Sequence, residues 1–505
     1  MSVEPQAAAE SVISVEPQVA DGSAAGIEPQ ASGESFVRPQ RGDELELEID
    51  SLAFGGEGVA RLGEGGYVVF VAGAIPGDRV RALVHKRKRS YAHARTLEVL
   101  RASPERIPPR AAHPGVPWQV LPYERQLEVK SAQVDEALRR IGQLDGYVLE
   151  EIVPALEQWR YRNKLEYSFG ADAARGGELV CGFHASAGAR EVVGIDDCLL
   201  ASEAGNRARE VALAWCRLQG LQAWERSSER SRREQLADGA AADGRAQLRN
   251  LVVREGRRTG ALQLRIVTTE GELEAGELAG ALSGGLGESL SGVLWTRTRS
   301  LAETTQGGET ELVWGEQELP ERLGELDLRI SAEAFFQTNT EMAELLYAVA
   351  TEYAALEGWE RVYDLYCGIG TIALTLAAHA GEVWGIELVE DAVADAIAGA
   401  RRNSVTNAHF FAGDTRTALP ELLARTGRPD VVVVDPPRAG LSKKVVQRII
   451  ETSPRRIVYV SCNPTTLAPN AAELIAAGWR LSRVRPVDMF PQTHHIECVA
   501  LFERG

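Results

Sequence analysis

Residues 362–371, VYDLYCGIGT, decide the fold of the C-terminal third of this chain. The first five residues have the pattern of a short buried strand, two glycines then make a tight turn, and an amphipathic helix pattern continues to His379. A strand, a glycine turn and a helix open a doubly wound sheet, in which a ligand binds at the carboxyl edge of the strand. The sequence therefore predicts a Rossmann-like α/β domain over residues 331–505.

The segments after this opening repeat the same alternation of strand and helix. Each apolar stretch is short, and a helical pattern separates it from the next. Two strands without an intervening helix end the chain, which indicates a parallel sheet with an antiparallel finish. The predicted strands are 383–388, 409–414, 431–437 and 456–462, followed by the final pair at about 481–490 and 495–503.

Acidic residues end two of these strands. Glu387 lies about twenty residues after the glycines, where a carboxylate can accept both ribose hydroxyls of an adenosine cofactor. Asp414 ends the next strand, a suitable place for a side chain near the adenine. The loop lacks the third glycine of a dinucleotide site, and the chain has no Gly-Lys-Ser/Thr phosphate loop. We therefore expect S-adenosylmethionine rather than NAD or ATP.

Two further motifs end neighbouring strands and bear on the chemistry. DPPRAG (435–440) alone is typical of sites that methylate an exocyclic amine, but SCNP (461–464) places Cys462 beside it. A thiolate that adds to C6 of uracil makes C5 nucleophilic, and HHIE (494–497) offers a base for the C5 proton. A cysteine at a strand end is often only a small buried residue, so these residues by themselves leave both reactions open.

The N-terminal part divides into a tail and a small barrel. Residues 1–40 repeat SVEPQ at 2–6 and 14–18 and are too polar to form a core, so we expect a disordered tail. Residues 41–100 alternate apolar and polar positions between glycines, which predicts an antiparallel β-barrel. The barrel ends in cations interleaved with Tyr91 and His93, a mix suited to RNA phosphates and bases: Arg79, Arg81, Lys86, Arg87, Lys88, Arg89 and Arg95.

Residues 101–330 have a mixed α+β pattern. The spacing of Leu127, Val134 and Leu138 predicts a surface helix over 122–142, which could pack on the catalytic domain. The stretch WRYRNKLEYSFG (159–170) places Arg162 and Lys164 among aromatic residues. This pattern indicates either RNA binding or a strand with one basic face. We interpret 101–330 as a central RNA-binding region.

Composition restricts the class of protein. The 505 residues carry 55 Lys+Arg against 72 Asp+Glu, and the net charge of −17 argues against indiscriminate binding of polyanions. No apolar run approaches the roughly 20 residues of a membrane helix, which excludes an integral membrane protein. The start MSVEPQAAAE is unlike a secretory signal, so we expect a cytoplasmic protein with reduced thiols. Its six cysteines include no Cys-x-x-Cys pair, and no zinc site is predicted.

Two resemblances combine these observations. GGEGVAR, GYVVFV and IPGDRV resemble a TRAM domain, an RNA-binding module of the oligonucleotide fold. QTN (337–339), DLYCGIGT, GIE, DPPRAG, SCNPTTLA and HIE, in this order, resemble the RNA 5-methyluridine methyltransferase family, which methylates C5 of uridines in 23S ribosomal RNA and in the tRNA T-loop. The resemblance implies that Cys462 attacks C6 and that Glu497 removes the C5 proton. It implies that the S-adenosylmethionine site contains Gln337, Tyr366, Thr371, Glu387, Asp414 and Asp435.

The resemblance also bears on the substrate and on metals. TRAM domains accompany ribosomal members more often, so 23S rRNA is the expected substrate, with tRNA as the alternative. A further alternative is an RNA-binding module whose methyltransferase domain is inactive or directed at an amine. Many ribosomal members hold an iron-sulfur cluster on four cysteines, but 111–123 contains no cysteine here and only Cys198 remains of the set. We therefore expect no cluster and no other metal, and a monomeric protein.

Overall fold

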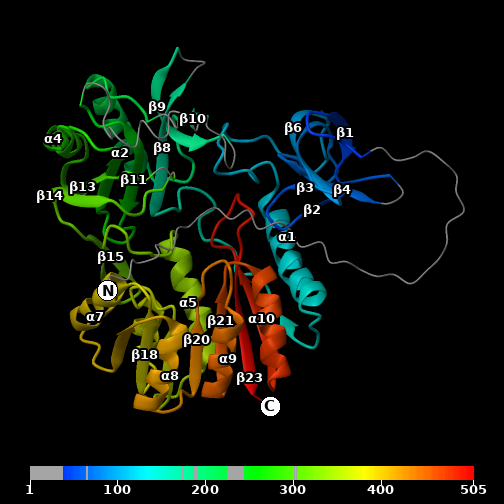
Figure 1. The fold of residues 1–505 in the computed structure, drawn as a ribbon, viewed down its shortest axis with the longest axis vertical. Helices are drawn as coiled ribbons and strands as arrows, with labels where there is room; N and C mark the ends of the chain where they lie inside the picture. The colour runs from blue at the N-terminus through cyan, green and yellow to red at the C-terminus, as the bar shows by residue number, and fades with distance from the viewer. Residues whose placement is uncertain are drawn as a thin grey trace, which may run out of the picture. The chain divides into compact units, whose positions relative to one another are not determined.

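The computed structural model describes residues 38–63, 66–172, 176–185, 191–224, 244–300, 302 and 304–504. They form two compact units, one from 38–110 with 117–129 and the other from 111–116 with 130–504 (Figure 1). The predicted N-terminal tail, up to residue 37, lies outside the described residues. Among the helices in the described part of the chain, none is both long and apolar enough to span a membrane.

The first unit contains a six-stranded barrel. Its strand order is β1-β5-β6-β4-β3-β2, and the outermost two, β1 and β2, are consecutive pieces of one bent segment, so the sheet closes on itself. Alternate side chains such as Leu47, Val69 and Val80 fill the interior. The predicted barrel is confirmed, although β4 and β6 pair in parallel where antiparallel pairing was expected throughout. The strands are β1 (Glu44–Glu48), β2 (Ser51–Leu52), β3 (Gly58–Leu62), β4 (Tyr67–Ala72), β5 (Arg79–Arg87) and β6 (Tyr91–Arg101).

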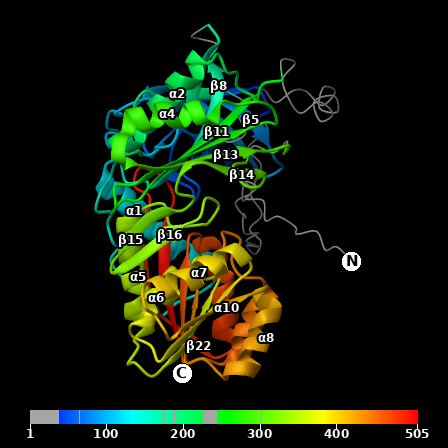
Figure 2. The ribbon, with the colours of Figure 1, turned by 90° about the vertical axis from the view of Figure 1, so that its left-hand side faces the viewer.

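The second unit begins with a seven-stranded sheet of order β10-β9-β8-β11-β12-β13-β14. Leu165, Tyr167 and Phe169 of β8 point to one face, which the helices α2 and α4 cover (Figure 2). The alternate residues, Lys164 and Glu166 among them, therefore point to the opposite face. The elements are β8 (Lys164–Asp172), β9 (Glu178–His184), β10 (Val192–Gly194), α2 (Glu203–Leu218), β11 (Leu248–Glu255), β12 (Leu262–Thr268), α4 (Ala275–Leu286), β13 (Leu290–Arg297) and β14 (Glu309–Gly315). A hairpin, β15 (Leu319–Leu323) and β16 (Leu326–Ile330), follows.

The C-terminal part of this unit is the predicted doubly wound domain. Its sheet has the order β19-β18-β17-β20-β21-β23-β22-β7, with β17 to β21 parallel and β23 antiparallel to both of its neighbours. The strands are β17 (Arg361–Leu365), β18 (Glu382–Glu387), β19 (Ala408–Ala412), β20 (Val431–Val434), β21 (Arg456–Ser461), β22 (Trp479–Val487) and β23 (Glu497–Arg504). The helices are α5 (Thr340–Ala354), α6 (Thr371–Ala377), α7 (Glu390–Arg402), α8 (Thr415–Thr426), α9 (Lys443–Thr452) and α10 (Pro464–Ala476).

One strand of this sheet comes from far upstream. β7 (Val148–Leu149) pairs in parallel with β22, although its residues belong to the predicted central region. Sequence patterns identified the later strands but not this two-residue edge, because so short a strand has no readable periodicity.

The helix predicted over 122–142 is α1 (Tyr123–Glu136), which continues as a π-helical turn, η1 (Ala137–Ile141), packed on α10. The prediction of a surface helix with its charges in solvent was wrong for Lys130, which is fully buried. Its ammonium group donates to Asp488 at 2.6 Å, and the Asp488 carboxylate is fully buried as well. A buried ammonium needs such a partner, since desolvation otherwise costs several kcal/mol.

Candidate active site

The glycine turn after β17 lines the candidate cofactor site. Gly368 and Gly370 have φ of 54° and 80°, in the left-handed region that favours glycine. A Cβ on Gly370 would lie 2.7 Å from the Phe410 ring, so the turn requires glycine for space as well. Tyr366 adopts φ of 64° just before the turn, an uncommon conformation for a residue with a side chain. Such a conformation is retained at sites where the surrounding structure imposes it.

A pocket opens above this turn and contains four of the six predicted cofactor residues. Gln337, Tyr366, Thr371 and Asp435 all line it. The Thr371 hydroxyl is also hydrogen-bonded to Tyr347, with 3.1 Å between the two oxygens. The other lining residues are Phe335, Phe336, Tyr347, Cys367, Gly368, Ile369 and Ile372.

The remaining two predicted cofactor residues differ in their placement. Glu387 ends β18 and accepts a hydrogen bond from the backbone N–H of Gly368 at 3.1 Å, so its carboxylate lies against the glycine turn. Asp414 is the N-cap of α8 and is paired with Arg416, and it is not among the residues that line the pocket. The structure therefore brings Glu387 to the edge of the pocket and gives Asp414 a local capping role.

The pocket contains acids that suit a cationic ligand. Burial raises the pKa of Asp435 to about 7, and a hydrogen bond with Gln337 opposes this rise. Asp364, which the sequence analysis missed, is fully buried, and its pKa is raised well above the usual value by burial and by Asp435. A hydrogen bond from the backbone of Ala373 opposes this rise. The available sequence signal was the position of Asp364 three residues before Cys367, where the predicted turn begins.

These features fit S-adenosylmethionine, which combines an adenosine with a sulfonium and an ammonium group. Glu387 at the end of the second strand could hold the ribose hydroxyls. Asp364 and Asp435 would gain a favourable charge interaction from a bound cation, because each is now disfavoured as an anion by burial. The donor set therefore matches the expected cofactor.

The register of β21 and β23 brings Cys462 and Glu497 together. Ser461 at the end of β21 is opposite Cys498 in the antiparallel pair, so the next positions along, Cys462 and Glu497, face one another. Cys462 is partly exposed, whereas the other five cysteines of the chain are buried. Exposure at this position makes Cys462 the thiol that a substrate can reach.

The electrostatics of this pair depend on their neighbours. Burial, Glu497 and Asp435 raise the pKa of Cys462 to about 12, and Arg438 lowers it. Burial and Asp435 raise the pKa of Glu497 well above its usual value, and Arg438 again opposes the rise. The thiol is thus protonated at rest, and a positive charge near this cluster would favour both anions.

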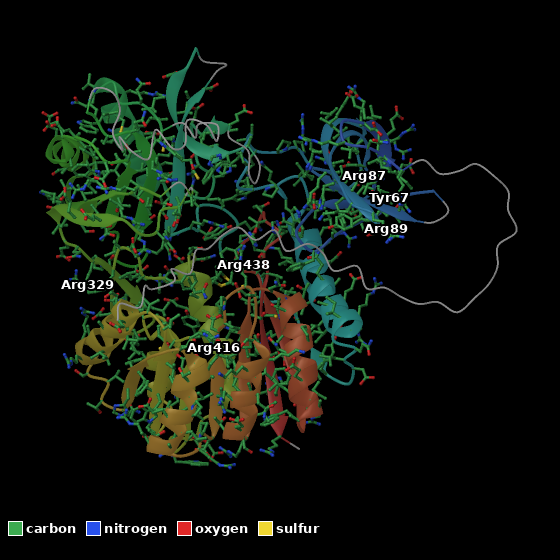
Figure 3. The ribbon with its side chains drawn as sticks, in the orientation of Figure 1. Tyr67, Arg87, Arg89, Arg329, Arg416 and Arg438 are labelled. Atoms are coloured by element: carbon green, nitrogen blue, oxygen red, sulfur yellow. The ribbon has the colours of Figure 1, made fainter. Side chains whose placement is uncertain are left out.

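Arg438 lies at the exposed side of the site (Figure 3). Its backbone carbonyl accepts a hydrogen bond from Asn463 Nδ2 at 3.1 Å, which ties DPPRAG to SCNP. Its guanidinium lies 3.5 Å from His495 Nδ1. Burial and nearby cations, His494 and Arg438 first, hold the pKa of His495 well below its usual value, so this imidazole is neutral.

The predicted RNA-contacting cluster of the barrel is smaller than its sequence suggests. Arg79 and Arg81 pair with Glu46, Glu44 and Glu98 across the sheet. Arg87, Lys88 and Arg89 are exposed at the end of β5 and in the turn to β6, with Lys86 half-buried beside them. Arg87 and Arg89 lie near Tyr67 in Figure 3. Among the described ion pairs, Arg87, Arg89 and Arg95 have no acidic partner, and all three are exposed.

Arg162 and Lys164 lie inside the second unit. The Arg162 guanidinium stacks over the Phe490 ring at 5.6 Å. Lys164 Nζ pairs with Glu166 at 2.6 Å, and burial and Arg254 lower its pKa. Both cations are only partly buried and have protein partners, and their contact with RNA stays a prediction.

His113 lies where the resemblance would place the first cluster cysteines. Its Nε2 is 3.3 Å from the Cys198 sulfur, and both side chains are buried. Burial lowers the pKa of His113 to about 4, so the contact involves a neutral imidazole. Within the described residues, no three His, Cys, Asp or Glu side chains gather as a metal site would require.

Comparisons with known proteins agree with this architecture. A family model described as tRNA (uracil-5-)-methyltransferase matches residues 315–505, and the TRAM domain model matches 38–97. An RNA methyltransferase of Chlorobaculum tepidum is 36% identical, covering 93% of this chain and 98% of the relative. One of Halalkalibacterium halodurans is 34% identical, covering 92% and 97%.

A solved structure is similar over nearly the whole chain. It is the Pyrococcus abyssi tRNA (uracil-54, C5)-methyltransferase in complex with S-adenosyl-L-homocysteine. It is 27% identical with a TM-score of 0.70, covering 90% of this chain and 99% of that one. The predicted fold class, with its N-terminal barrel and doubly wound domain, is confirmed.

Proposed function

This chain belongs to the S-adenosylmethionine-dependent RNA uracil-5-methyltransferase family with a TRAM domain, and we propose that it methylates C5 of a specific uridine through a covalent bond from Cys462 to C6. The observation that carries the proposal is the facing pair of Cys462 and Glu497 beside Asp435 of the cofactor pocket. A thiol and a carboxyl group are the two groups that uracil C5 methylation requires.

The proposed reaction uses these residues in order. The Cys462 thiol gives its proton to solvent and its sulfur adds to C6, which places the electron pair of the C5–C6 double bond at C5. Bound S-adenosylmethionine supplies an electrophilic methyl group, which C5 accepts as the C–S bond of the cofactor breaks. Glu497 takes the C5 proton, the C5–C6 double bond forms again, and the sulfur of Cys462 leaves C6 and regains a proton.

The acids of the site explain why Arg438 matters to this reaction. Asp435 raises the pKa of both Cys462 and Glu497, and Glu497 also raises the pKa of Cys462, so ionisation of one of these acids disfavours ionisation of the thiol. Arg438 opposes this effect for both Cys462 and Glu497. A bound sulfonium would act in the same direction. We therefore infer that the nucleophile and base become more readily ionised once the cofactor is present.

The uridine must leave its stack to reach this site, because C6 and C5 react with groups above and below the plane of the ring. We propose 23S rRNA as the substrate, because TRAM domains accompany the ribosomal members of the family more often. The similarity to the Pyrococcus abyssi tRNA enzyme over 90% of this chain favours tRNA as the second candidate. The exposed cations at 86–89 are proposed to bind phosphates, and the chain is proposed to act as a monomer in the cytoplasm.

The deciding experiment is methyl transfer from tritiated S-adenosylmethionine to separate 23S rRNA and tRNA transcripts, followed by nucleoside analysis. We expect labelled 5-methyluridine in one RNA class and its loss in Cys462→Ala. Cys216→Ala, which removes a buried thiol of the central core, is the matched control and should retain activity. Labelled methyladenosine, or full activity of Cys462→Ala, would contradict the proposal and favour an amine-directed reaction at Asp435-Pro436-Pro437.

A second variant tests the role of Glu497. In Glu497→Gln the methyl group can be transferred but the C5 proton has no carboxylate to accept it, so the Cys462 sulfur cannot leave readily. We expect a covalent RNA–protein species that survives denaturing electrophoresis and carries the tritium label. The double variant with Cys462→Ala should not form it. Normal turnover by Glu497→Gln would exclude this carboxylate as the base.

A further inference from the structure

A segment without regular secondary structure supplies part of the cofactor pocket. Residues 331–339, SAEAFFQTN, connect β16 to α5. Phe335, Phe336 and Gln337 of this segment line the pocket, and Gln337 is hydrogen-bonded to Asp435. Because no helix or sheet ladder fixes these residues, their position depends on other parts of the chain that hold the backbone.

Arg254 of β11 holds the first half of the segment. Its two terminal nitrogens donate to the backbone carbonyls of Ser331 at 2.8 Å and Ala334 at 2.6 Å. The Arg254 side chain is buried, and burial lowers its pKa to about 10, so it remains charged at neutral pH. A charged, two-pronged donor of this kind fixes both distance and direction of the backbone it binds.

Asn163, which precedes β8, holds the second half. Its backbone N–H donates to the carbonyl of Thr338 at 2.9 Å. Its side-chain Nδ2 donates to the carbonyl of Gln337 and to the Thr340 hydroxyl, each at 2.8 Å. The Asn163 carbonyl accepts from the backbone of Glu255 at 2.8 Å, so Asn163 and Arg254 come from adjacent positions of the central sheet.

We propose that Asn163 and Arg254 are positioning residues for binding of the methyl donor. They fix the backbone of the segment 331–339, and this backbone presents Gln337 and Phe336 to the pocket. The inference rests on the proposed cofactor site. It extends the role of the central region, which the sequence analysis assigned to RNA alone, because this region then determines the affinity for S-adenosylmethionine as well.

The same strand provides a matched control. Arg249 of β11 is equally buried, and its two terminal nitrogens donate to the backbone carbonyls of Ser300 and Ala302. Residues 300 and 302 do not line the cofactor pocket. Arg254→Met and Arg249→Met therefore remove the same side chain and each release two backbone carbonyls, but only the first releases the segment 331–339.

The test is equilibrium dialysis of S-adenosylmethionine against the full chain without RNA, together with RNA filter binding and thermal unfolding. We expect Arg254→Met and Asn163→Ala to weaken S-adenosylmethionine binding about tenfold, roughly the net effect of one charge-assisted hydrogen bond. Arg249→Met should change it less than about twofold. Both arginine variants should unfold at similarly lowered temperatures, and RNA binding should be unchanged in all three.

The outcomes separate positioning from a general loss of stability. If Arg254→Met does not fold, Arg254→Lys retains the charge on a single nitrogen without the two-pronged geometry and should show an intermediate loss of affinity. Equal S-adenosylmethionine binding in the Asn163, Arg254 and Arg249 variants would overturn this inference alone. Failure of the unmodified protein to bind S-adenosylmethionine would overturn the proposed function and this inference with it.

Discussion

Lowering the pH from 8 to 6 should weaken binding of S-adenosylmethionine about tenfold. Burial raises the pKa of Asp435 to about 7, so this pocket carboxyl is mainly protonated at pH 6 and mainly ionised at pH 8. If the cationic cofactor binds the ionised form, the apparent dissociation constant is the intrinsic value divided by the ionised fraction. That fraction is about one eleventh at pH 6 and about ten elevenths at pH 8.

The direction of this pH dependence follows from the positive charge of the cofactor and the negative charge of ionised Asp435. A raised pKa means that the free protein disfavours the anion, and a bound cation reverses this preference, so binding removes a proton from Asp435 below pH 7. The logarithm of the dissociation constant should therefore rise by about one for each pH unit below the pKa and become flat above it. Burial also raises the pKa of Asp364 and of Glu497 well above the usual values, so Asp435→Asn is needed to assign the titration to Asp435.

The assay is equilibrium dialysis with tritiated S-adenosylmethionine between pH 5.5 and 8.5 in the absence of RNA. Asp435→Asn is the informative variant, because the amide imitates the protonated acid at every pH. Its affinity should resemble that of the unmodified protein at low pH and show little further change as the pH rises. An equally steep pH dependence in Asp435→Asn would refute the assignment of the titration to this carboxyl.

Three other predictions concern the packing and the RNA surface. Lys130→Met should lower the free energy of unfolding in urea by about 3–5 kcal/mol, because it leaves Asp488 buried without its partner, and adding Asp488→Asn should recover part of the loss. Gly370→Ala should cost about 1–3 kcal/mol in the same assay and weaken cofactor binding, since alanine at φ of 80° is strained and contacts Phe410. The double change of Arg87 and Arg89 to alanine should weaken filter binding of every RNA and reduce the slope of log K against log salt by about one to two, whereas an unchanged slope would exclude phosphate contacts.

Local sequence patterns predicted the catalytic domain well for a physical reason. A buried parallel strand, a glycine turn and an amphipathic helix are each encoded within about ten residues, and the ends of parallel strands meet at one edge of the sheet. Residues at strand ends, such as Glu387, Asp435 and Cys462, could therefore be assigned to one site before their distances were known. Asp414 was assigned by the same rule and stays a prediction, and the structure adds that it caps α8 and pairs with Arg416.

Partners that are distant in sequence could not be predicted in this way. Lys130 has the spacing of an exposed helical residue, and only the fold brings Asp488 to it. The same is true of Arg254 and Asn163, whose acceptors are the backbone carbonyls of a remote loop and carry no sequence signal. The RNA contact of Lys164 stays a prediction, and a sequence shows the charge of Lys164 but does not show that the Glu166 carboxylate lies 2.6 Å from its ammonium group.

The position of β23 has a consequence for the order in which the protein can be assembled. This strand follows both β21 and β22 in the chain, yet it lies between them in the sheet. Until it emerges, β21 has an unpaired edge on that side, and an exposed edge can pair with another chain. Because β23 begins with Glu497, the nascent protein acquires its proposed proton acceptor only in the step that closes the sheet. Burial of the exposed edge of β21 and the gain of the proposed proton acceptor therefore coincide.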